Sequence, residues 1–202
     1  MNLKKIHQIS GLIISIFIGL HLFNHFCSIS GADKHIEIMN HLRYFYRNII
    51  VETVLFFSIA IQIYSGLKLF KSKRQTADSF FEKLHIWSGI YLAIFFVIHL
   101  SAVLVGRLVL NLDTNFYFGV AGLNSFPFNL FFIPYYSLAI LSFFAHLACI
   151  HAKKMKHHFL GLSPTKQAIS ILMLGFIFIL YGLTNHFYGV KIPSEYNILI
   201  GK

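Results

Sequence analysis

Charged residues are scarce in this chain of 202 residues: Asp, Glu, Lys and Arg make up only 12% of it, whereas 56% is hydrophobic. Four stretches contain no charged residue at all, namely residues 6–32, 84–106, 114–152 and 167–190. Each is at least as long as the roughly 20 residues that cross a bilayer as a helix. No soluble core of this size needs so much apolar surface. This composition excludes a water-soluble enzyme, a nucleic-acid-binding domain and a disordered tail.

Cysteine and acidic residues are also few. The two cysteines, Cys27 and Cys149, lie near the ends of apolar segments that we expect to emerge on opposite sides of the membrane, which excludes a disulfide framework and a CxxC metal site. Seven acidic residues against 17 Lys and Arg give a formal net charge of +10. In a membrane protein this excess is explained by the distribution of basic residues between the two faces, so we predict no nucleic-acid partner.

Five apolar segments are predicted to cross the membrane as helices, which gives an all-α membrane protein with one transmembrane domain over residues 1–202. Helices are favoured because the alternating strands that a β-barrel needs are absent. The second span carries Glu52 near its start and Lys68 near its end, but both lie close to an interface, where charge is tolerated. The predicted spans are residues 6–28, 49–70, 82–106, 128–151 and 168–188.

Basic residues predict the orientation, because the face richer in Lys and Arg lies in the cytoplasm. Eleven lie at the face that holds the amino terminus: Lys4, Lys5, Lys68, Lys71, Lys73, Arg74, Lys83, Lys153, Lys154, Lys156 and Lys166. Six lie at the other face: Lys34, Arg43, Arg47, Arg107, Lys191 and Lys202. We therefore expect an integral protein of a bacterial cytoplasmic membrane with a cytoplasmic amino terminus, an external carboxy terminus and external connections at residues 30–48 and 111–126.

Twelve histidines are the most unusual feature, and four of them recur at one spacing. His7 and His21 are 14 residues apart, as are His85 and His99, and a Ser-Gly pair follows the first histidine in both cases. At about 100° per residue, this spacing places both histidines of a pair on one helix face, about 21 Å apart. Since the first and third spans run in the same direction, we expect an outer pair, His21 and His99, at one depth and an inner pair, His7 and His85, at another.

Two neutral imidazoles that face each other across a helix bundle are the ligands that a six-coordinate b-type haem needs. The pattern therefore predicts His21 and His99 as axial ligands of one haem iron. The inner pair, His7 and His85, is a candidate for a second haem, with solvated interfacial histidines as the alternative. Three other histidines in the spans are as readily helix-packing residues as ligands: His25, His146 and His186.

Small and basic residues near these histidines complete the predicted haem sites. Gly11, Gly19 and Gly89 are expected to let a porphyrin approach the backbone. The arginines at the external face are candidate partners for haem propionates: Arg43, Arg47 and Arg107. The histidines between the spans are predicted to be exposed: His35, His41, His157 and His158.

Short motifs extend in order over about 180 residues of the chain. They are His7-Gln8-Ile9-Ser10-Gly11 through His21-Leu22, Tyr64-Ser65-Gly66, Trp87-Ser88-Gly89 through Ile98-His99, His146, and Tyr181-Gly182-Leu183-Thr184. This set resembles the five-helix cytochrome b membrane-anchor subunit of succinate:quinone oxidoreductases and fumarate reductases.

The resemblance implies one haem between the first and third helices, at positions that match His21 and His99 and so agree with the spacing. It implies another between the second and fourth helices. The fourth-helix position matches His146, but Gln62 stands where the second-helix histidine is expected. Three outcomes stay open: one haem only, an inner haem on the inner pair, or an inner haem that recruits His146 with one member of that pair.

The predicted function is that of a haem b membrane cytochrome that transfers electrons between a quinone and a partner redox subunit, as in succinate dehydrogenase. The resemblance implies flavoprotein and iron-sulfur partners on the basic cytoplasmic face, beside the contact with membrane lipid. One alternative is a self-contained haem membrane oxidoreductase. Another is a non-redox transporter or assembly protein whose histidines carry protons or pack helices. Candidate polar groups for a quinone site are Gln62, Ser65, His25 and Glu52.

Overall fold

The computed structural model describes residues 2–201, apart from the side chain of Asn185. Five of its helices are long and apolar enough to cross a membrane. They are α1 (Leu3–Phe26), α3 (Ile49–Lys73), α4 (Phe80–Leu108), α6 (Asn129–Lys154) and α7 (Pro164–Tyr181). The predicted all-α fold with five helices long and apolar enough to span a membrane is confirmed. The helix ends lie within four residues of the predicted ones, except that α7 ends at Tyr181, seven residues before the predicted end.

Polar side chains fix where the spans begin. The Asn48 side chain accepts a hydrogen bond from the Ile50 amide at 3.0 Å at the start of α3. Ser79 and Glu82 form a reciprocal capping box at the start of α4, and the Ser163 hydroxyl caps α7. These contacts satisfy amides that no helical carbonyl can reach, so each apolar segment starts at a defined residue.

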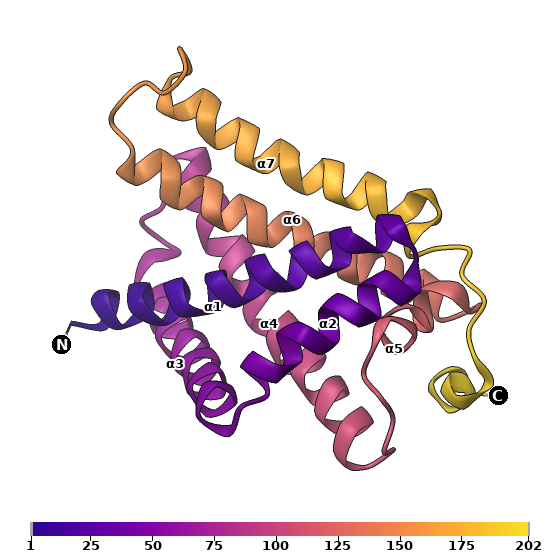
Figure 1. Ribbon diagram of the computed structural model, residues 1–202. Coiled ribbons are helices and arrows are strands. Elements are labelled where there is room, and N and C mark those ends of the chain that lie inside the picture. The colour runs from indigo at the N-terminus through magenta and orange to yellow at the C-terminus, as the bar shows by residue number, and fades with distance from the viewer. Residues whose placement is uncertain (1, 202) are drawn as a thin grey trace.

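The spans pack as two groups (Figure 1). α1 packs mainly against α3, whereas α6 packs against both α4 and α7, and it runs alongside α7 over most of its length. Contacts between α3 and α4 join the groups. Since successive spans alternate in direction, α1, α4 and α7 run parallel. Side chains of α1 and α4 that point inward therefore meet across the interior between the two groups.

Short helical segments fill the connections and the tail. They are η1 (Cys27–Ser30), α2 (Ala32–Tyr46), α5 (Phe116–Val120), η2 (Gly122–Asn124), the π-helical turn η3 (Gly182–His186) and η4 (Ser194–Ile200). All except η1, which continues α1, and η3, which continues α7, lie between or beyond the spans. Both cysteines are free, as the sequence predicts.

The end of the bundle that carries α2, called the α2 end below, is a packed layer. α2 buries His35 and Met39, one helical turn apart, against the bundle. In the tail, Tyr196 is fully buried in a cluster with Ala121. Asn124 hydrogen-bonds the tail backbone through both ends of its amide, at 2.8 Å each. Lys202 lies outside the described residues.

The prediction that His35 is exposed was wrong, since its exposed fraction is only 2%. The cause is that the connection after α1 folds as a helix with one inward face. His35 lies on that face and packs on the α1 terminus and on the ring of Phe116 in α5, with ring centroids 5.1 Å apart.

Candidate functional site

The outer pair meets in the interior of the bundle. The ring centroids of His21 on α1 and His99 on α4 lie 6.4 Å apart, and the ring planes are inclined at 66°. With a metal–nitrogen distance of about 2 Å, two imidazoles on opposite sides of one ion have ring centres about 6 Å apart. The structure therefore brings together the two residues that the spacing predicts as partners, at a separation that suits two ligands of one iron.

Aromatic rings hold both imidazoles of the outer pair. Phe17, one turn before His21, lies parallel to its ring at a centroid distance of 6.0 Å, and Phe95 stacks on His99 at 5.0 Å. Tyr136 of α6 meets the His99 ring edge-on at 6.3 Å. Gly19 lies two residues before His21, so it faces the opposite side of α1, where a Cβ built on it meets no described atom within 4 Å. The walls that these residues form around the site are aromatic.

Two further histidines extend this site toward the α2 end, and we call the four residues His21, His25, His35 and His99 the outer histidine cluster. His25 Nε2 lies 3.1 Å from His21 Nε2, and His25 Nδ1 lies 3.3 Å from His35 Nε2. One nitrogen of each contact carries the proton, so three imidazoles form a continuous chain. The contribution of His35 was missed in the sequence, although its four-residue spacing from Met39 is the periodic signal of a buried helix face.

The outer histidine cluster also contains polar atoms without partners. The Asn24 Nδ2 group lies 3.1 Å from His35 Nε2. Within the described residues, Asn24 Oδ1 and His35 Nδ1 are buried and make no hydrogen bond. A buried polar atom of this kind costs about 1–3 kcal/mol when it is left unpaired. Burial, with His21 and Arg43 nearby, lowers the pKa of His35 to about 4, so it is neutral at physiological pH.

The inner pair is arranged differently, because its two members have different neighbours. His7 Nδ1 lies 2.8 Å from the Ser65 hydroxyl, and His7 Nε2 lies 3.2 Å from Gln62 Nε2, both on α3. The Ser10 hydroxyl donates to Gln62 Oε1 at 2.6 Å. Two of the residues proposed for a quinone site, Gln62 and Ser65, thus converge on His7 within the span.

His85 lies beside His146 of α6, with ring centroids 4.2 Å apart and planes inclined at 38°. This separation is shorter than the roughly 6 Å between two imidazoles on opposite sides of a metal ion. The Ser88 hydroxyl lies 3.3 Å from His146 Nδ1, and a Cβ on Gly89 would stand 3.2 Å from His146 Cε1. The two imidazoles therefore pack against each other, too close together to be the opposite ligands of one ion.

The Ser-Gly pairs seat side chains from adjacent helices. Gly11 faces Gln62, with its would-be Cβ 3.2 Å from Nε2, as Gly89 faces His146. Gln62 therefore contacts Ser10 and Gly11 in the same way that His146 contacts Ser88 and Gly89. In the described residues, Gly11 and Gly89 make room for these side chains, whereas Gly19 faces open space.

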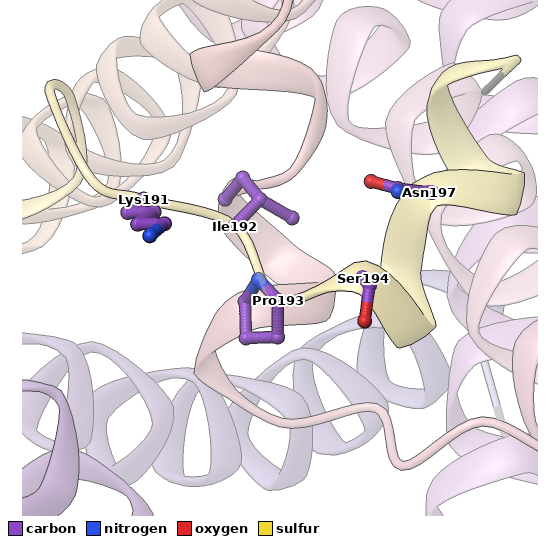
Figure 2. A pocket seen from close by; sticks show the side chains of 5 residues that line it. All are labelled: Lys191, Ile192, Pro193, Ser194 and Asn197. Atoms are coloured by element: carbon purple, nitrogen blue, oxygen red, sulfur yellow. The ribbon is translucent and has the colours of Figure 1, made fainter.

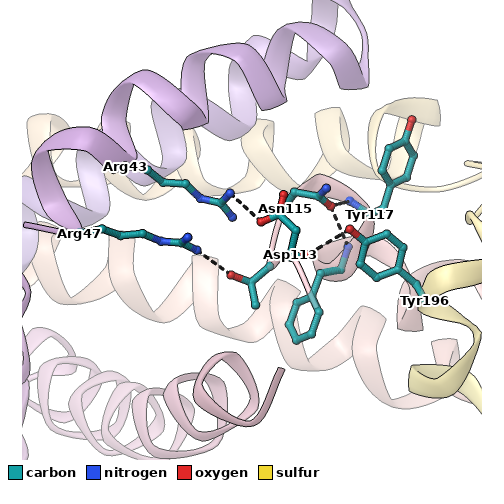
Figure 3. Close-up of polar contacts among 8 residues, drawn as sticks. Arg43, Arg47, Asp113, Asn115, Tyr117 and Tyr196 are labelled. Atoms are coloured by element: carbon teal, nitrogen blue, oxygen red, sulfur yellow. Dashed lines mark hydrogen bonds and ion pairs between the residues drawn. The ribbon is translucent and has the colours of Figure 1, made fainter. Parts of the chain in front are cut away.

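Arginines gather at the α2 end (Figure 3). Arg43 of α2 pairs with Asp113 at 2.7 Å, and Arg47 donates to the Thr114 hydroxyl at 3.1 Å. Arg107 at the end of α4 pairs with Glu52 at the start of α3, at 2.6 Å. Glu52 is an acidic residue in the first turn of α3 and Arg107 a basic residue in the last turn of α4, so each charge is also favourable with respect to its helix dipole. Glu52, proposed from the sequence for a quinone site, is therefore held in an ion pair.

The tail contributes to this layer through Tyr196, whose hydroxyl donates to the Asp113 carbonyl at 3.0 Å. Burial raises the pKa of Tyr196 to about 12, with Glu195 and Asp113 adding to the shift. The phenol is therefore protonated at physiological pH and serves as a donor. It links the tail to the loop that also holds Arg43.

A cavity of about 470 Å³ has no histidine among its lining residues (Figure 2). It is formed by one segment of the tail, beyond the last span. Its lining residues are Lys191, Ile192, Pro193, Ser194 and Asn197. A second cavity of about 40 Å³ lies between α6 and α7 and includes Tyr136.

Within residues 2–201, no group of three or more His, Cys, Asp or Glu side chains is arranged to hold a metal ion. A haem iron needs only two protein ligands, since the porphyrin supplies the others. The donor set of the outer pair fits that requirement. Comparison with protein-family models, curated proteins and solved structures finds no match to this chain.

Proposed function

We propose that the protein is a membrane cytochrome that holds haem b between His21 and His99 and passes electrons between a quinone and a partner redox subunit. The single observation that carries the proposal is the 6.4 Å separation of these two rings across the bundle. When bound, the haem supplies one-electron redox chemistry. The chain supplies the two neutral nitrogen ligands and the aromatic, water-poor surroundings that tune the potential.

His25 is the residue next to a ligand in this proposal. The 3.1 Å contact between the two Nε2 atoms orients the His21 ring and leaves Nδ1 of His21 as the nitrogen for the iron. A hydrogen bond at the other ring nitrogen is the usual support of a metal-bound imidazole. The stacked rings of Phe17 and Phe95 keep both imidazoles from turning.

The site for the quinone is proposed at the polar group formed by His7, Gln62 and Ser65. A quinone carbonyl is an acceptor, and the Gln62 amide has two N–H donors, only one of which faces His7 Nε2. The buried Ser65 hydroxyl contacts His7 Nδ1 and so positions the imidazole. The inner pair and His146 remain candidates for a second haem. Partner flavoprotein and iron-sulfur chains would dock on the basic face, which we place in the cytoplasm of a bacterial cell.

A second candidate function is proton transfer by a non-redox transporter. It is favoured by the chain of three imidazoles from His35 through His25 to His21, in which neighbouring nitrogens lie 3.1 to 3.3 Å apart. Intramembrane histidines in such a chain are typical of proton relays. A haem spectrum separates this candidate from the cytochrome.

The test is a pyridine-haemochrome assay and an absorption spectrum of the full chain purified from a haem-replete membrane. We expect a low-spin b-type spectrum that is lost in His21→Ala and in His99→Ala. His41→Ala is the matched control, because His41 is exposed on α2. A full low-spin signal in both ligand variants would reject the assignment. Co-purification of flavin and iron-sulfur chains would separate an anchor subunit from a self-contained oxidoreductase.

A further inference from the structure

The arginines of the α2 end outnumber the carboxylates that face them. Arg43 and Arg107 each have a carboxylate partner at 2.7 Å and 2.6 Å. In the described part of the chain, the third arginine, Arg47, has only the neutral Thr114 hydroxyl. The group therefore carries one positive charge that no carboxylate of residues 2–201 balances.

Arg47 sits in an environment that disfavours an unpaired cation. Its side chain is partly buried at the end of α2. Burial lowers the pKa of its guanidinium, and the neighbouring charges of Arg43 and Arg107 lower it further, against smaller opposite effects of Tyr46 and Asp113. A partly desolvated charge next to like charges is costly unless an anion joins it. The guanidinium uses one of its five N–H donors on Thr114, so the rest of its planar fork is available to an oxyanion.

The residues around Arg47 indicate the source of that anion. Tyr44 and Phe45 precede it, and Ile49 and Ile50 follow it at the start of α3. Their exposed fractions are 91%, 62%, 74% and 71%. Exposed aromatic and aliphatic side chains beside a basic residue, at the end of a span, are typical of the level of lipid headgroups. A small soluble anion makes no favourable contact with these apolar side chains, whereas the acyl chains of a lipid do.

We propose that Arg47 binds the phosphate of an anionic phospholipid, with the acyl chains lying along Phe45, Ile49 and Ile50. The lipid phosphate completes the charge balance of the arginine group and fixes the turn between α2 and α3 at the membrane surface. None of its residues is a proposed haem ligand. Arg47 is also a candidate partner for a haem propionate, and the experiment below distinguishes that anion from a lipid phosphate.

The experiment titrates the full chain, purified in detergent, with phosphatidylglycerol and with phosphatidylcholine of the same acyl chains, and counts bound lipids by native mass spectrometry. Removing one basic contact at a membrane surface corresponds to about a fivefold loss of affinity. We expect Arg47→Gln to weaken phosphatidylglycerol binding by about fivefold or more and to abolish its preference over phosphatidylcholine. Lys34→Gln is the matched control, because it removes the same charge from an exposed position on α2. We expect it to leave both properties unchanged.

Ile50→Asp gives a second variant that keeps the fold. The side chain is exposed, and an acidic residue in the first turn of a helix is favourable. Its carboxylate repels a phosphate at Arg47, so a loss at least as large as that of Arg47→Gln is expected. Equal phosphatidylglycerol binding by the parent chain and both variants overturns the proposal. It is also overturned if Arg47→Gln leaves lipid binding intact but changes the affinity for haem and not for haem dimethyl ester, since the anion is then a haem propionate.

Discussion

Acidification is expected to loosen α2 from the rest of the bundle, because His35 is buried as a neutral group. Burial lowers its pKa from 6.5 to about 4 in the folded chain. As the pH falls below 6.5, the opened form takes up a proton first, so the stability of the closed form is lost between pH 6.5 and pH 4. Over the whole window the shift amounts to about 3 kcal/mol. Between pH 7 and pH 5 the loss is about 1.8 kcal/mol, or about a 20-fold larger opening constant.

Hydrogen–deuterium exchange of the α2 amides measures this opening directly, once the intrinsic pH dependence of exchange has been subtracted. Protection of α2 relative to α3 should fall by about 20-fold from pH 7 to pH 5. His35→Gln should remove most of that dependence, whereas His41→Gln, at an exposed position of the same helix, should keep it. A change of less than about threefold in the parent chain, or an equal change in His35→Gln, would refute the reasoning.

Three other outcomes are expected. A reporter fused to the carboxy terminus should be active only outside the cytoplasm, as the distribution of Lys and Arg predicts, and activity confined to the cytoplasm would reverse the topology. If the inner pair holds a second haem, a His7→Ala, His85→Ala double variant should lower the haem per chain from about two to about one. A value near one in both the parent chain and the variant would show that only the outer haem is bound. Gly122→Ala should destabilise the chain by about 1–3 kcal/mol, because the new Cβ overlaps the Phe132 ring. Gly19→Ala, which meets open space, should leave the melting temperature unchanged or raise it, and similar losses in both would show that the Phe132 contact is not the cause.

The sequence alone determined the five spans and the pairing of His21 with His99. Both follow from local rules: a bilayer sets the length of an apolar helix, and the helical period sets which residues share a face and a depth. Two parallel spans with the same motif therefore place their histidines at one level, whatever the detailed packing. The same rules predicted that the two cysteines stay apart.

Only the tertiary structure decided what lies next to each of these groups. Sequence spacing gives depth and face, but it does not say which helix packs against which. The pairing of α4 with α6 brings His146 to His85, and the pairing of α1 with α3 turns His7 toward Gln62. His35 was expected at the surface and is buried, because the chain between two spans folds back as a helix and covers the end of the bundle. Arg47 is short of a carboxylate for a similar reason, since the carboxylates that its neighbours use come from α3 and from the loop before α5. Contacts of this kind depend on the packing of distant segments, which the local periodicity of a helix does not encode.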